Sequence, residues 1–429
     1  MAQNNPFFHR GPVRDPTYFS GRAREVDFLA DLLRQGQSIA ISGPRRFGKT
    51  SLLFYLAHPD VAAAHGLGDD TTRRVYLDGG MLDGLNEEWF YGAIDRALGG
   101  TADTISYPRF VERLRTLAAQ NLRCILVVDE FELIAANPHF GRELFNRLRG
   151  LAAQLPLQFI TASKDPLVQL TFAHPETLSS PFFNMFAPLS LTVLADDEAV
   201  DLLAVLSARG GRPFAPDTLG FLFELAGPHP LFLQVAGYHA FAALRSERTL
   251  GTLSAEARDA VQSQTLADLA PHLQYYWNSL DPQARYTLAA LPLYGNERQS
   301  SAVERLYTAG LLRRGTYLSR VLETFVRRQQ VEGLLQAGVF ILDVHRGLAA
   351  VCGNLVHLTP TEFAALRLFL SRPGQLVTLE AIEAALWPGE IVADPERARG
   401  VVKKLRAALG PASKAIVNSR GQGYLLSLD

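Results

Sequence analysis

The chain has 429 residues, of which 48% are hydrophobic and 20% charged, and its formal net charge is −1. This length exceeds what one hydrophobic core supports and predicts two to four domains, while the composition excludes a globally disordered chain. Because the net charge is near zero, any surface for nucleic acid must be local rather than a property of the whole chain.

The cysteines and the hydropathy pattern bear on the compartment. Cys124 and Cys352 are far apart in sequence and form no Cys-x-x-Cys or Cys/His ligand pattern, which argues against a disulfide framework or a zinc site and favours a reducing compartment. The chain has no apolar run of about 18 residues and no secretory signal pattern. We therefore expect a cytoplasmic protein with no membrane partner.

Short apolar strands alternate with helices in the first half of the chain. Residues 1–18, rich in Asn, Pro and aromatic residues, are predicted to be a lead-in segment without regular structure. Strands are then predicted at 38–42, 74–77, 124–128 and 157–162, and the continuous apolar run at 124–128 is typical of a strand buried on both faces. The alternation over residues 19–190 predicts a doubly wound α/β core with a parallel sheet.

Residues 43–51 carry a phosphate-binding pattern. They read Gly-Pro-Arg-Arg-Phe-Gly-Lys-Thr-Ser, matching G-x-x-x-x-G-K-[ST] between a predicted strand and a helix at 50–57. Backbone amides of such a loop surround phosphates at the helix N-terminus, Lys49 brings a positive charge to the β and γ phosphates, and Thr50 offers a hydroxyl to Mg²⁺. The pattern predicts an ATP/ADP and Mg²⁺ site made by Gly43, Pro44, Arg45, Arg46, Phe47, Gly48, Lys49, Thr50 and Ser51.

Two acids follow the strand at 124–128. A carboxylate at the end of a buried strand is costly unless it has a partner or a function. Asp129 is therefore predicted to hold the magnesium shell and Glu130 to activate the attacking water, although both acids could simply cap the next helix. The next strand ends at 161–163, which would place Thr161 or Ser163 beside the γ-phosphate as a polar sensor.

These residues predict a P-loop ATPase with Lys49, Asp129, Glu130 and Ser163 in catalytic roles. No arginine finger can be identified from the sequence. Because such an arginine can be worth about 10³-fold in rate, hydrolysis is expected to be slow and regulatory.

The chain becomes wholly helical after residue 190. Residues 191–255 are predicted to form a helical lid, with helices beginning at Asp196 and at 217–226 and 230–244. Residues 256–330 are predicted to form a small helical domain, with helices near 257–269, 273–280, 282–291, 300–309 and 321–330.

Residues 331–429 are predicted to contain three short strands, three helices and a terminal hairpin. The third helix, 395–409, places an apolar stripe opposite basic residues, and seven basic residues but no acid occur between Arg397 and Arg420. This asymmetry predicts a surface for double-stranded DNA, although a basic helix used for protein contact remains the alternative. The predicted DNA-binding residues are Arg397, Arg399, Lys403, Lys404, Arg406 and Arg420.

Two motifs in the first three quarters of the chain resemble those of AAA-like and STAND-type signalling ATPases. The segment from Tyr18 to Glu25 resembles their F-x-G-R-x-x-E lead-in, and Gly227-Pro-His-Pro230 resembles the G-x-P element of their helical lid. The resemblance, over about residues 5–330, implies an ASCE-type sheet and a small winged helix within 256–330. It also implies that Arg22 and Pro230 lie near the nucleotide, whereas otherwise they are a surface arginine and a helix-start proline.

The C-terminal domain resembles the effector domain of OmpR/PhoB-class response regulators. The matching segments are Leu358-Thr-Pro-Thr-Glu-Phe, Pro373-Gly-Gln-Leu-Val, Ala385-Leu-Trp, Lys404-Leu-Arg-Ala-Ala-Leu and Arg420-Gly-Gln-Gly-Tyr. The resemblance implies a winged helix-turn-helix that binds DNA. Ala408 and Leu425 stand where basic residues are common in that class, which implies weak DNA affinity for a monomer.

Together the two resemblances imply an ATP-dependent transcription regulator that holds ADP at rest and rearranges or forms a homo-oligomer with ATP. Two alternatives remain at this point. The chain could be an ATPase that acts on DNA directly, as a replication or transposition loader does, or a defence or stress sensor whose winged helix is an interaction module. Neither an HExxH nor a GxSxG motif is present to indicate another enzymatic activity.

Overall fold

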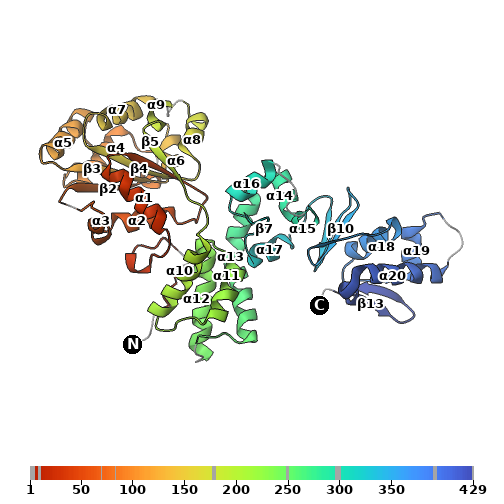
Figure 1. Ribbon diagram of the computed structural model, residues 1–429. Coiled ribbons are helices and arrows are strands. Elements are labelled where there is room, and N and C mark those ends of the chain that lie inside the picture. Colours follow the sequence, from red (N-terminus) through yellow and green to blue (C-terminus); the bar gives the residue numbers. More distant parts are fainter. Residues whose placement is uncertain are drawn as a thin grey trace. The chain divides into compact units, whose positions relative to one another are not determined.

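The computed structural model describes residues 5–7, 11–68, 70–82, 84–175, 180–247, 251–294, 301–389 and 394–427. The chain divides into two compact units, Met1–Thr265 and Leu266–Asp429, whose elements are labelled in Figure 1. In the part of the chain described, no helix is both long enough and apolar enough to cross a lipid bilayer.

The first unit is built on a five-stranded sheet. Its strands are β1 (Ser38–Ser42), β2 (Thr72–Asp78), β3 (Arg123–Asp129), β4 (Leu157–Ser163) and β5 (Phe186–Ser190), in the order β2-β3-β4-β1-β5. All neighbouring strands are parallel, which confirms the predicted α/β class. The strand β5 was not predicted, because this half-exposed edge strand contains Pro188 and lacks a continuous apolar run.

Helices cover both faces of the sheet. On one face α1 (Ala23–Arg34), α2 (Lys49–Ala57) and α3 (Pro59–Ala64) pack on the side chains of Ile125 and Val127. On the other face α4 (Glu87–Ala97), α5 (Tyr107–Ala119), α6 (Phe131–Ala136), α7 (Arg142–Ala152), α8 (Leu167–Ala173) and α9 (Ser180–Phe183) pack on Leu126 and Val128. Successive residues of β3 thus enter different cores, which explains its uninterrupted apolar sequence.

Three helices of the same unit form the lid: α10 (Asp196–Arg209), α11 (Pro216–Ala226) and α12 (Pro230–Glu247). The lead-in segment is anchored in this bundle. Phe7 is buried and stacks on Phe214 with 5.7 Å between ring centroids, and the Asn5 side-chain amide donates to the Tyr238 carbonyl at 2.9 Å. Further along, the segment contains a short 3₁₀ helix, η1 (Pro16–Tyr18).

One long helix, α13 (Ala255–Ser279), follows the lid. The prediction of two helices, near 257–269 and 273–280, was wrong. Pro271 lies inside the helix, where a proline removes one backbone donor but does not have to end the helix if the following turns continue. The boundary between the two compact units falls within α13.

The second unit begins with a small helical region. It contains α14 (Pro282–Ala289), α15 (Leu291–Tyr294), α16 (Ser301–Thr308) and α17 (Arg320–Val326). A hairpin of β6 (Leu312–Arg313) and β7 (Thr316–Tyr317) precedes α17. The predicted turn at 313–316 is the tip of this hairpin, in which Arg314 has a left-handed backbone with φ of 48°.

The rest of the second unit is a winged helix preceded by a four-stranded antiparallel sheet. The sheet has the order β11-β10-β9-β8, and β8 was missed by the sequence analysis. Its strands are β8 (Leu334–Ala337), β9 (Phe340–Asp343), β10 (Leu348–Val351) and β11 (Asn354–Val356). The helices are α18 (Pro360–Ser371), α19 (Leu379–Leu386) and α20 (Pro395–Leu409), and the wing sheet β12-β14-β13 contains β12 (Leu376–Thr378), β13 (Ile416–Ser419) and β14 (Gly423–Leu426).

A buried carboxylate joins the helical region to the antiparallel sheet. Asp343, at the end of β9, is inaccessible to solvent and accepts hydrogen bonds from the hydroxyls of Tyr286 and Tyr294. The backbone amides of His345 and Arg346 donate to its other oxygen at 3.0 and 3.1 Å. Within the second unit, α14 and α15 are therefore tied to β9 by a satisfied polar cluster rather than by a loose linker.

Candidate nucleotide-binding site and DNA-binding surface

The phosphate-binding loop follows β1 as predicted, and Gly43 lets its start lie close to Leu191, the residue after β5. Gly43 has φ of 153°, and a Cβ there would lie 2.6 Å from the Leu191 carbonyl oxygen, so no larger residue fits. Gly48, with φ of 90°, turns the chain into α2 at Lys49. The two glycines of the motif thus shape the loop for different physical reasons.

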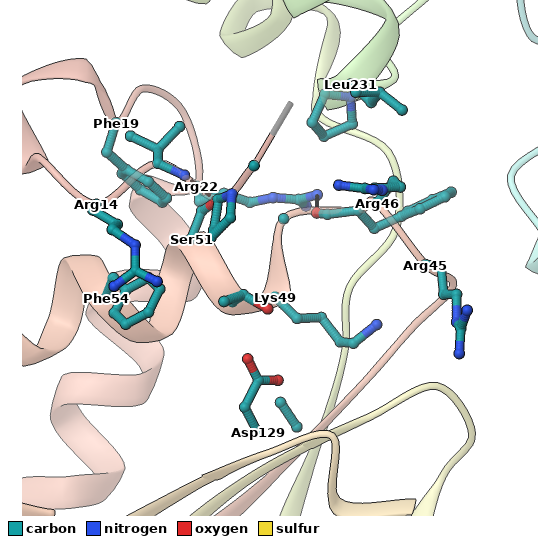
Figure 2. A pocket seen from close by; sticks show the side chains of 18 of the residues that line it. Arg14, Phe19, Arg22, Arg45, Arg46, Lys49, Ser51, Phe54, Asp129 and Leu231 are labelled. Atoms are coloured by element: carbon teal, nitrogen blue, oxygen red, sulfur yellow. Dashed lines mark hydrogen bonds between the residues drawn. The ribbon is translucent and has the colours of Figure 1, made fainter. Parts of the chain in front are cut away.

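A cavity of about 740 Å³ opens over this loop. Its lining includes residues 45–51 of the loop, the acids Asp129, Glu130 and Glu132, lead-in residues 11–14 and 18–20, and residues 230, 231 and 234 of the lid. Figure 2 shows Lys49 and Asp129 among the side chains that line this space. A strand, a loop and a helix N-terminus with this lining can accept a nucleotide with its phosphates on the loop.

Lys49 extends back along the loop. Its ammonium donates to the carbonyl oxygens of Gly43 and Pro44 at 2.6 and 3.0 Å. Burial lowers the pKa of Lys49, and the charges of Glu132 and Asp129 oppose this shift. Because the ammonium is held by weak neutral acceptors, phosphate oxygens would be stronger partners in the same place.

Asp129 ends β3 as predicted, and both of its oxygens have donors. The Tyr76 hydroxyl donates to Oδ2 at 3.0 Å, and the Glu130 amide donates to Oδ1 at 3.0 Å. Burial and the Asp129 charge raise the pKa of Tyr76, so its hydroxyl remains a donor. Asp129 is only 4% exposed, yet it lines the cavity together with Thr50.

The oxygen donors present fit Mg²⁺. Thr50 offers a hydroxyl and Asp129 a carboxylate, and magnesium prefers a few such hard ligands completed by substrate phosphates and water. Among the residues described, no group of three or more His, Cys, Asp or Glu could hold a metal by itself. The metal would therefore be held jointly by Thr50, Asp129 and the nucleotide.

Glu130 occupies an unusual backbone position, with φ of 48°. Its carboxylate approaches Gly80, where an added Cβ would lie 3.5 Å from Glu130 Oε2 and 3.3 Å from Asp78 Oδ1. Burial raises the pKa of Glu130, and the charges of Asp78 and Asp129 raise it further. A carboxyl with a raised pKa can accept a proton from water.

Asp78 was not among the predicted site residues. It ends β2 in register with Asp129 on β3 and lines the cavity. Asp78 is the last residue of a strand that is only partly buried, and its place beside Asp129 follows from the pairing of β2 with β3.

Arg22 and Pro230 both line the cavity. Arg22 is 4% exposed. Its guanidinium donates to the carbonyls of Phe47 and Thr192 and pairs with Glu25. Arg22 is therefore not a surface arginine, and its bonds within the protein fix the loop carbonyl of Phe47.

The loop also touches the lid directly. The buried ring of Phe47 meets His229 edge-on, with 4.7 Å between centroids, and His229 directly precedes Pro230, the first residue of α12. A change in the shape of the loop would therefore alter its contact with the lid.

Some predicted site residues face away from the cavity. Ser163 ends β4, but its hydroxyl donates to the Asp165 carbonyl at 2.6 Å, and Ser163 is not among the lining residues. Gly43 and Pro44 also lie outside the lining and contribute carbonyls to Lys49. The Ser51 hydroxyl accepts a hydrogen bond from the Val13 amide at 3.0 Å, which ties the lead-in segment to α2.

The predicted basic face lies on α20 of the second unit. Ala398, Val402, Leu405 and Leu409 are buried in the core of the winged helix. Lys403 and Lys404 are exposed on this helix, and so is Arg420 at the tip of the β13–β14 hairpin. These positions leave their charges available to phosphates.

The other basic residues of α20 have partners within the protein. Arg406 donates to the Ile416 carbonyl and lies over the Tyr424 ring, so it ties α20 to the wing. Arg397 lies 3.8 Å over the Trp387 ring, and Arg399 pairs with Glu396 one turn before it. Among the basic residues of α20, Lys403 and Lys404 are therefore the best suited to a test of DNA contact.

Two family models match the chain. Residues 100–283 match Novel STAND NTPase 2, and residues 353–426 match Transcriptional regulatory protein, C terminal. The first range includes Asp129, Glu130 and Pro230, and the second includes α18, α20 and the wing. Both resemblances inferred from the sequence are thereby confirmed.

Curated relatives match about a fifth of the chain. Transcriptional activator protein IrlR of Burkholderia pseudomallei is 32% identical over 89 residues, covering 20% of this chain and 39% of that protein. Sensory transduction protein RegX3 of Mycobacterium tuberculosis is 30% identical over 98 residues, covering 22% of this chain and 43% of that protein. The chain thus spans about two-fifths of the length of these relatives.

Solved structures match most of the chain in fold. The ORC2 protein of Aeropyrum pernix, in ADPNP–ADP complexes, superposes with a TM-score of 0.52 at 15% identity, covering 74% of this chain and 98% of that one. The Walker-type ATPase paby2304 of Pyrococcus abyssi gives the same TM-score and identity, covering 74% of this chain and 99% of that one. At this identity the likeness establishes the fold alone.

Proposed function

We propose that this chain, which joins a STAND NTPase domain to a DNA-binding domain of the response-regulator type, is a nucleotide-controlled transcription regulator. ATP or ADP in the first unit sets how the second unit engages double-stranded DNA. The observation that carries the proposal is the convergence of Lys49, Asp129 and Glu130 on one cavity, in a chain whose other end exposes the lysines of α20.

The residues of the cavity have separate roles in ATP hydrolysis. Lys49 exchanges its bonds to loop carbonyls for bonds to the β and γ phosphates. Bound Mg²⁺, held by Thr50 and Asp129, supplies positive charge to the phosphate oxygens. Glu130 orients the attacking water and accepts its proton.

Hydrolysis by an isolated chain is slow in this proposal. Of the three arginines on α7, the helix that follows α6, Arg149 is exposed, and the other two are held within their own domain. Arg142 donates to the Pro175 carbonyl at 2.5 Å, and Arg147 pairs with Glu87 and Glu143. Because a stabilising arginine can be worth about 10³-fold in rate, a slow ATPase fits a switch that remains in one state until it is reset.

DNA binding rests on the second unit. Lys403 and Lys404 on α20 contact phosphates beside the groove that α20 enters, and Arg420 contacts the backbone from the wing. Phosphate neutralisation of this kind gives an affinity that falls steeply as salt rises.

The test is DNA binding in defined nucleotide states. Full-length protein would be titrated onto genomic promoter fragments by fluorescence anisotropy in ADP, in ATP and in a non-hydrolysable ATP analogue, each with Mg²⁺. We expect about tenfold or greater tightening with the ATP analogue relative to ADP, which corresponds to a coupling free energy of about 1.4 kcal/mol.

Lys49→Ala is the matched control. It removes the phosphate contact while leaving α20 intact, so its DNA affinity is expected to be the same in every nucleotide state. Equal DNA affinity of the unaltered protein in all three states would reject nucleotide control. Tight binding without sequence preference would favour an ATPase that acts on DNA directly, and the absence of DNA binding in every state would favour an interaction module.

A further inference from the structure

A column of side chains runs from the lead-in segment to the magnesium carboxylate. The Arg14 guanidinium lies 4.5 Å from the centroid of the Phe54 ring, and Phe54 stacks on Tyr76 with 5.0 Å between centroids. The Tyr76 hydroxyl then donates to Asp129 Oδ2 at 3.0 Å. Figure 2 shows the first of these contacts, with Arg14 over Phe54 beside Lys49 and Asp129.

Each member of the column sits on a different element around the cavity. Arg14 belongs to the lead-in segment, Phe54 to α2, Tyr76 to β2 and Asp129 to β3, and all four line the nucleotide cavity. Phe54 lies one turn beyond Thr50 on the same helix. The ring of Tyr76 is therefore held from the helix that carries one proposed magnesium ligand, while its hydroxyl holds the other.

The hydrogen bond from Tyr76 restricts the rotation of the Asp129 carboxylate, which the backbone of Asp129 does not control. A carboxylate offers about four lone-pair positions, and here the Glu130 amide and the Tyr76 hydroxyl each take one, on different oxygens. Both donors fix the rotation of the carboxylate about its last bond and leave the remaining positions for the cavity. Outer partners of this kind commonly change metal affinity by about 10–100-fold when removed.

We propose that Tyr76 is a positioning residue that orients Asp129 for Mg²⁺, with its ring held by Phe54 and Arg14. This inference rests on the proposed nucleotide function and adds a residue that the phosphate-binding motif does not contain. Tyr76 acts through Asp129, to which its hydroxyl donates.

The test is Tyr76→Phe, which keeps the ring on Phe54 and removes only the hydroxyl. Equilibrium binding of a fluorescent ATP analogue would be measured in EDTA and then across a Mg²⁺ titration. Affinity in EDTA is expected to stay within about twofold, because the phosphates are held by the loop. The Mg²⁺ concentration that gives half of the metal-dependent tightening is expected to rise about tenfold or more.

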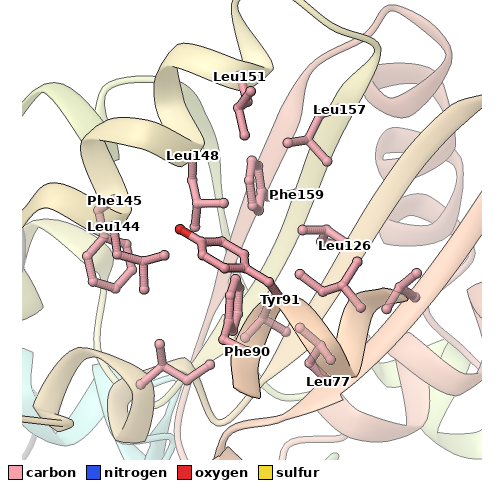
Figure 3. Packing of buried hydrophobic residues seen from close by; sticks show 14 of the residues in the cluster. Leu77, Phe90, Tyr91, Leu126, Leu144, Phe145, Leu148, Leu151, Leu157 and Phe159 are labelled. Atoms are coloured by element: carbon pink, nitrogen blue, oxygen red, sulfur yellow. The ribbon is translucent and has the colours of Figure 1, made fainter. Parts of the chain in front are cut away.

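Tyr91→Phe is the matched control. Tyr91 is buried among Leu126, Leu148 and Phe159, as Figure 3 shows, whereas Tyr76 packs against the core on the other face of the sheet. The Tyr91 hydroxyl donates to Glu87 at 3.4 Å and also interacts with Arg147, and neither partner lines the cavity. This variant also removes a tyrosine hydroxyl that bonds a carboxylate in the same domain, and its Mg²⁺ titration is expected to match that of the unaltered protein.

The outcomes separate this inference from the proposed function. A Tyr76→Phe protein with an unchanged Mg²⁺ midpoint would overturn the inference, and so would one that weakens binding equally in EDTA, because that result would mean that Tyr76 shapes the pocket. If the unaltered protein binds no nucleotide or shows no effect of Mg²⁺, the proposed function itself fails.

Discussion

At the scale of single residues, the surroundings of Glu130 make hydrolysis sensitive to pH. Burial and the neighbouring charges of Asp78 and Asp129 raise the pKa of Glu130, so this group becomes protonated at a higher pH than an ordinary glutamate. Only the carboxylate form can accept a proton from water. The turnover rate at saturating ATP is therefore expected to decline, as pH falls, at a higher pH than an ordinary glutamate would give.

Two substitutions test this pH dependence. Asp78→Asn removes a negative neighbour and lowers the pKa of Glu130, so the acid limb of the rate profile is expected to move to lower pH.

Glu130→Gln is expected to lose about 10²-fold or more of the turnover while retaining nucleotide affinity. An acid limb that stays in place in Asp78→Asn, or normal turnover in Glu130→Gln, would assign the base to another group.

The sequence predicted the loop and the Asp-Glu pair because their chemistry depends on spacing along the chain. Tyr76 and Asp78 escaped prediction because they meet Asp129 and Glu130 only after β2 pairs with β3. Ser163 was placed near the phosphate by its strand position, but its hydroxyl has a nearer acceptor at Asp165. Which local partner a short side chain takes is decided by turn geometry that the sequence does not show.

At the scale of elements, α20 carries the charge that DNA would meet. Lys403→Ala combined with Lys404→Ala is expected to reduce the slope of log affinity against log salt by about 2, since each phosphate contact contributes about 1. Binding should weaken to a similar degree on all DNA sequences. The measurement is anisotropy over a range of potassium chloride concentrations.

A second charge-removal variant controls for net charge. Arg367→Ala combined with Arg372→Ala removes two exposed charges from α18 and its end and should leave the slope unchanged. Equal slopes in both double variants would show that another face contacts DNA. Arg406 is excluded from the test, because its loss would also detach α20 from Ile416 and Tyr424.

Element types with long or strongly patterned sequences were predictable, and short or unusual ones were not. The helix α20 was predicted at 395–409, where Asp394 caps it and Pro395 begins it. By contrast, β5 contains Pro188 and is half-exposed, and β8 is buried only at its first and last residues, so neither has a continuous apolar run. The continuation of α13 through Pro271 reflects its tertiary setting, which overrides a local signal to end the helix.

At the scale of the whole molecule, weak DNA binding by one chain can be strengthened by assembly. When two DNA-binding domains are held together and one of them binds DNA, the other is at a high effective concentration near the adjacent site. We expect the ATP-analogue complex to form homo-oligomers and the ADP complex to stay smaller. Mass photometry of the full chain in each nucleotide measures this difference directly.

The control for assembly is again Lys49→Ala, which should give one mass distribution whatever nucleotide is added. Identical mass distributions for the unaltered protein with ADP and with the ATP analogue would reject nucleotide-dependent assembly. Regulation would then have to act through a change in shape of a single chain.

The anchoring of Phe7 in the lid and of Val13 on α2 sets a limit on how far the lid can travel. Phe7 packs on Phe214, the Val13 amide bonds Ser51, and six residue steps separate the two anchors. A fully extended peptide of that length reaches only about 20 Å. While both anchors hold, this length limits how far Phe214 of the lid can lie from Ser51 of α2, and glycines inserted between Phe7 and Val13 are expected to raise that limit.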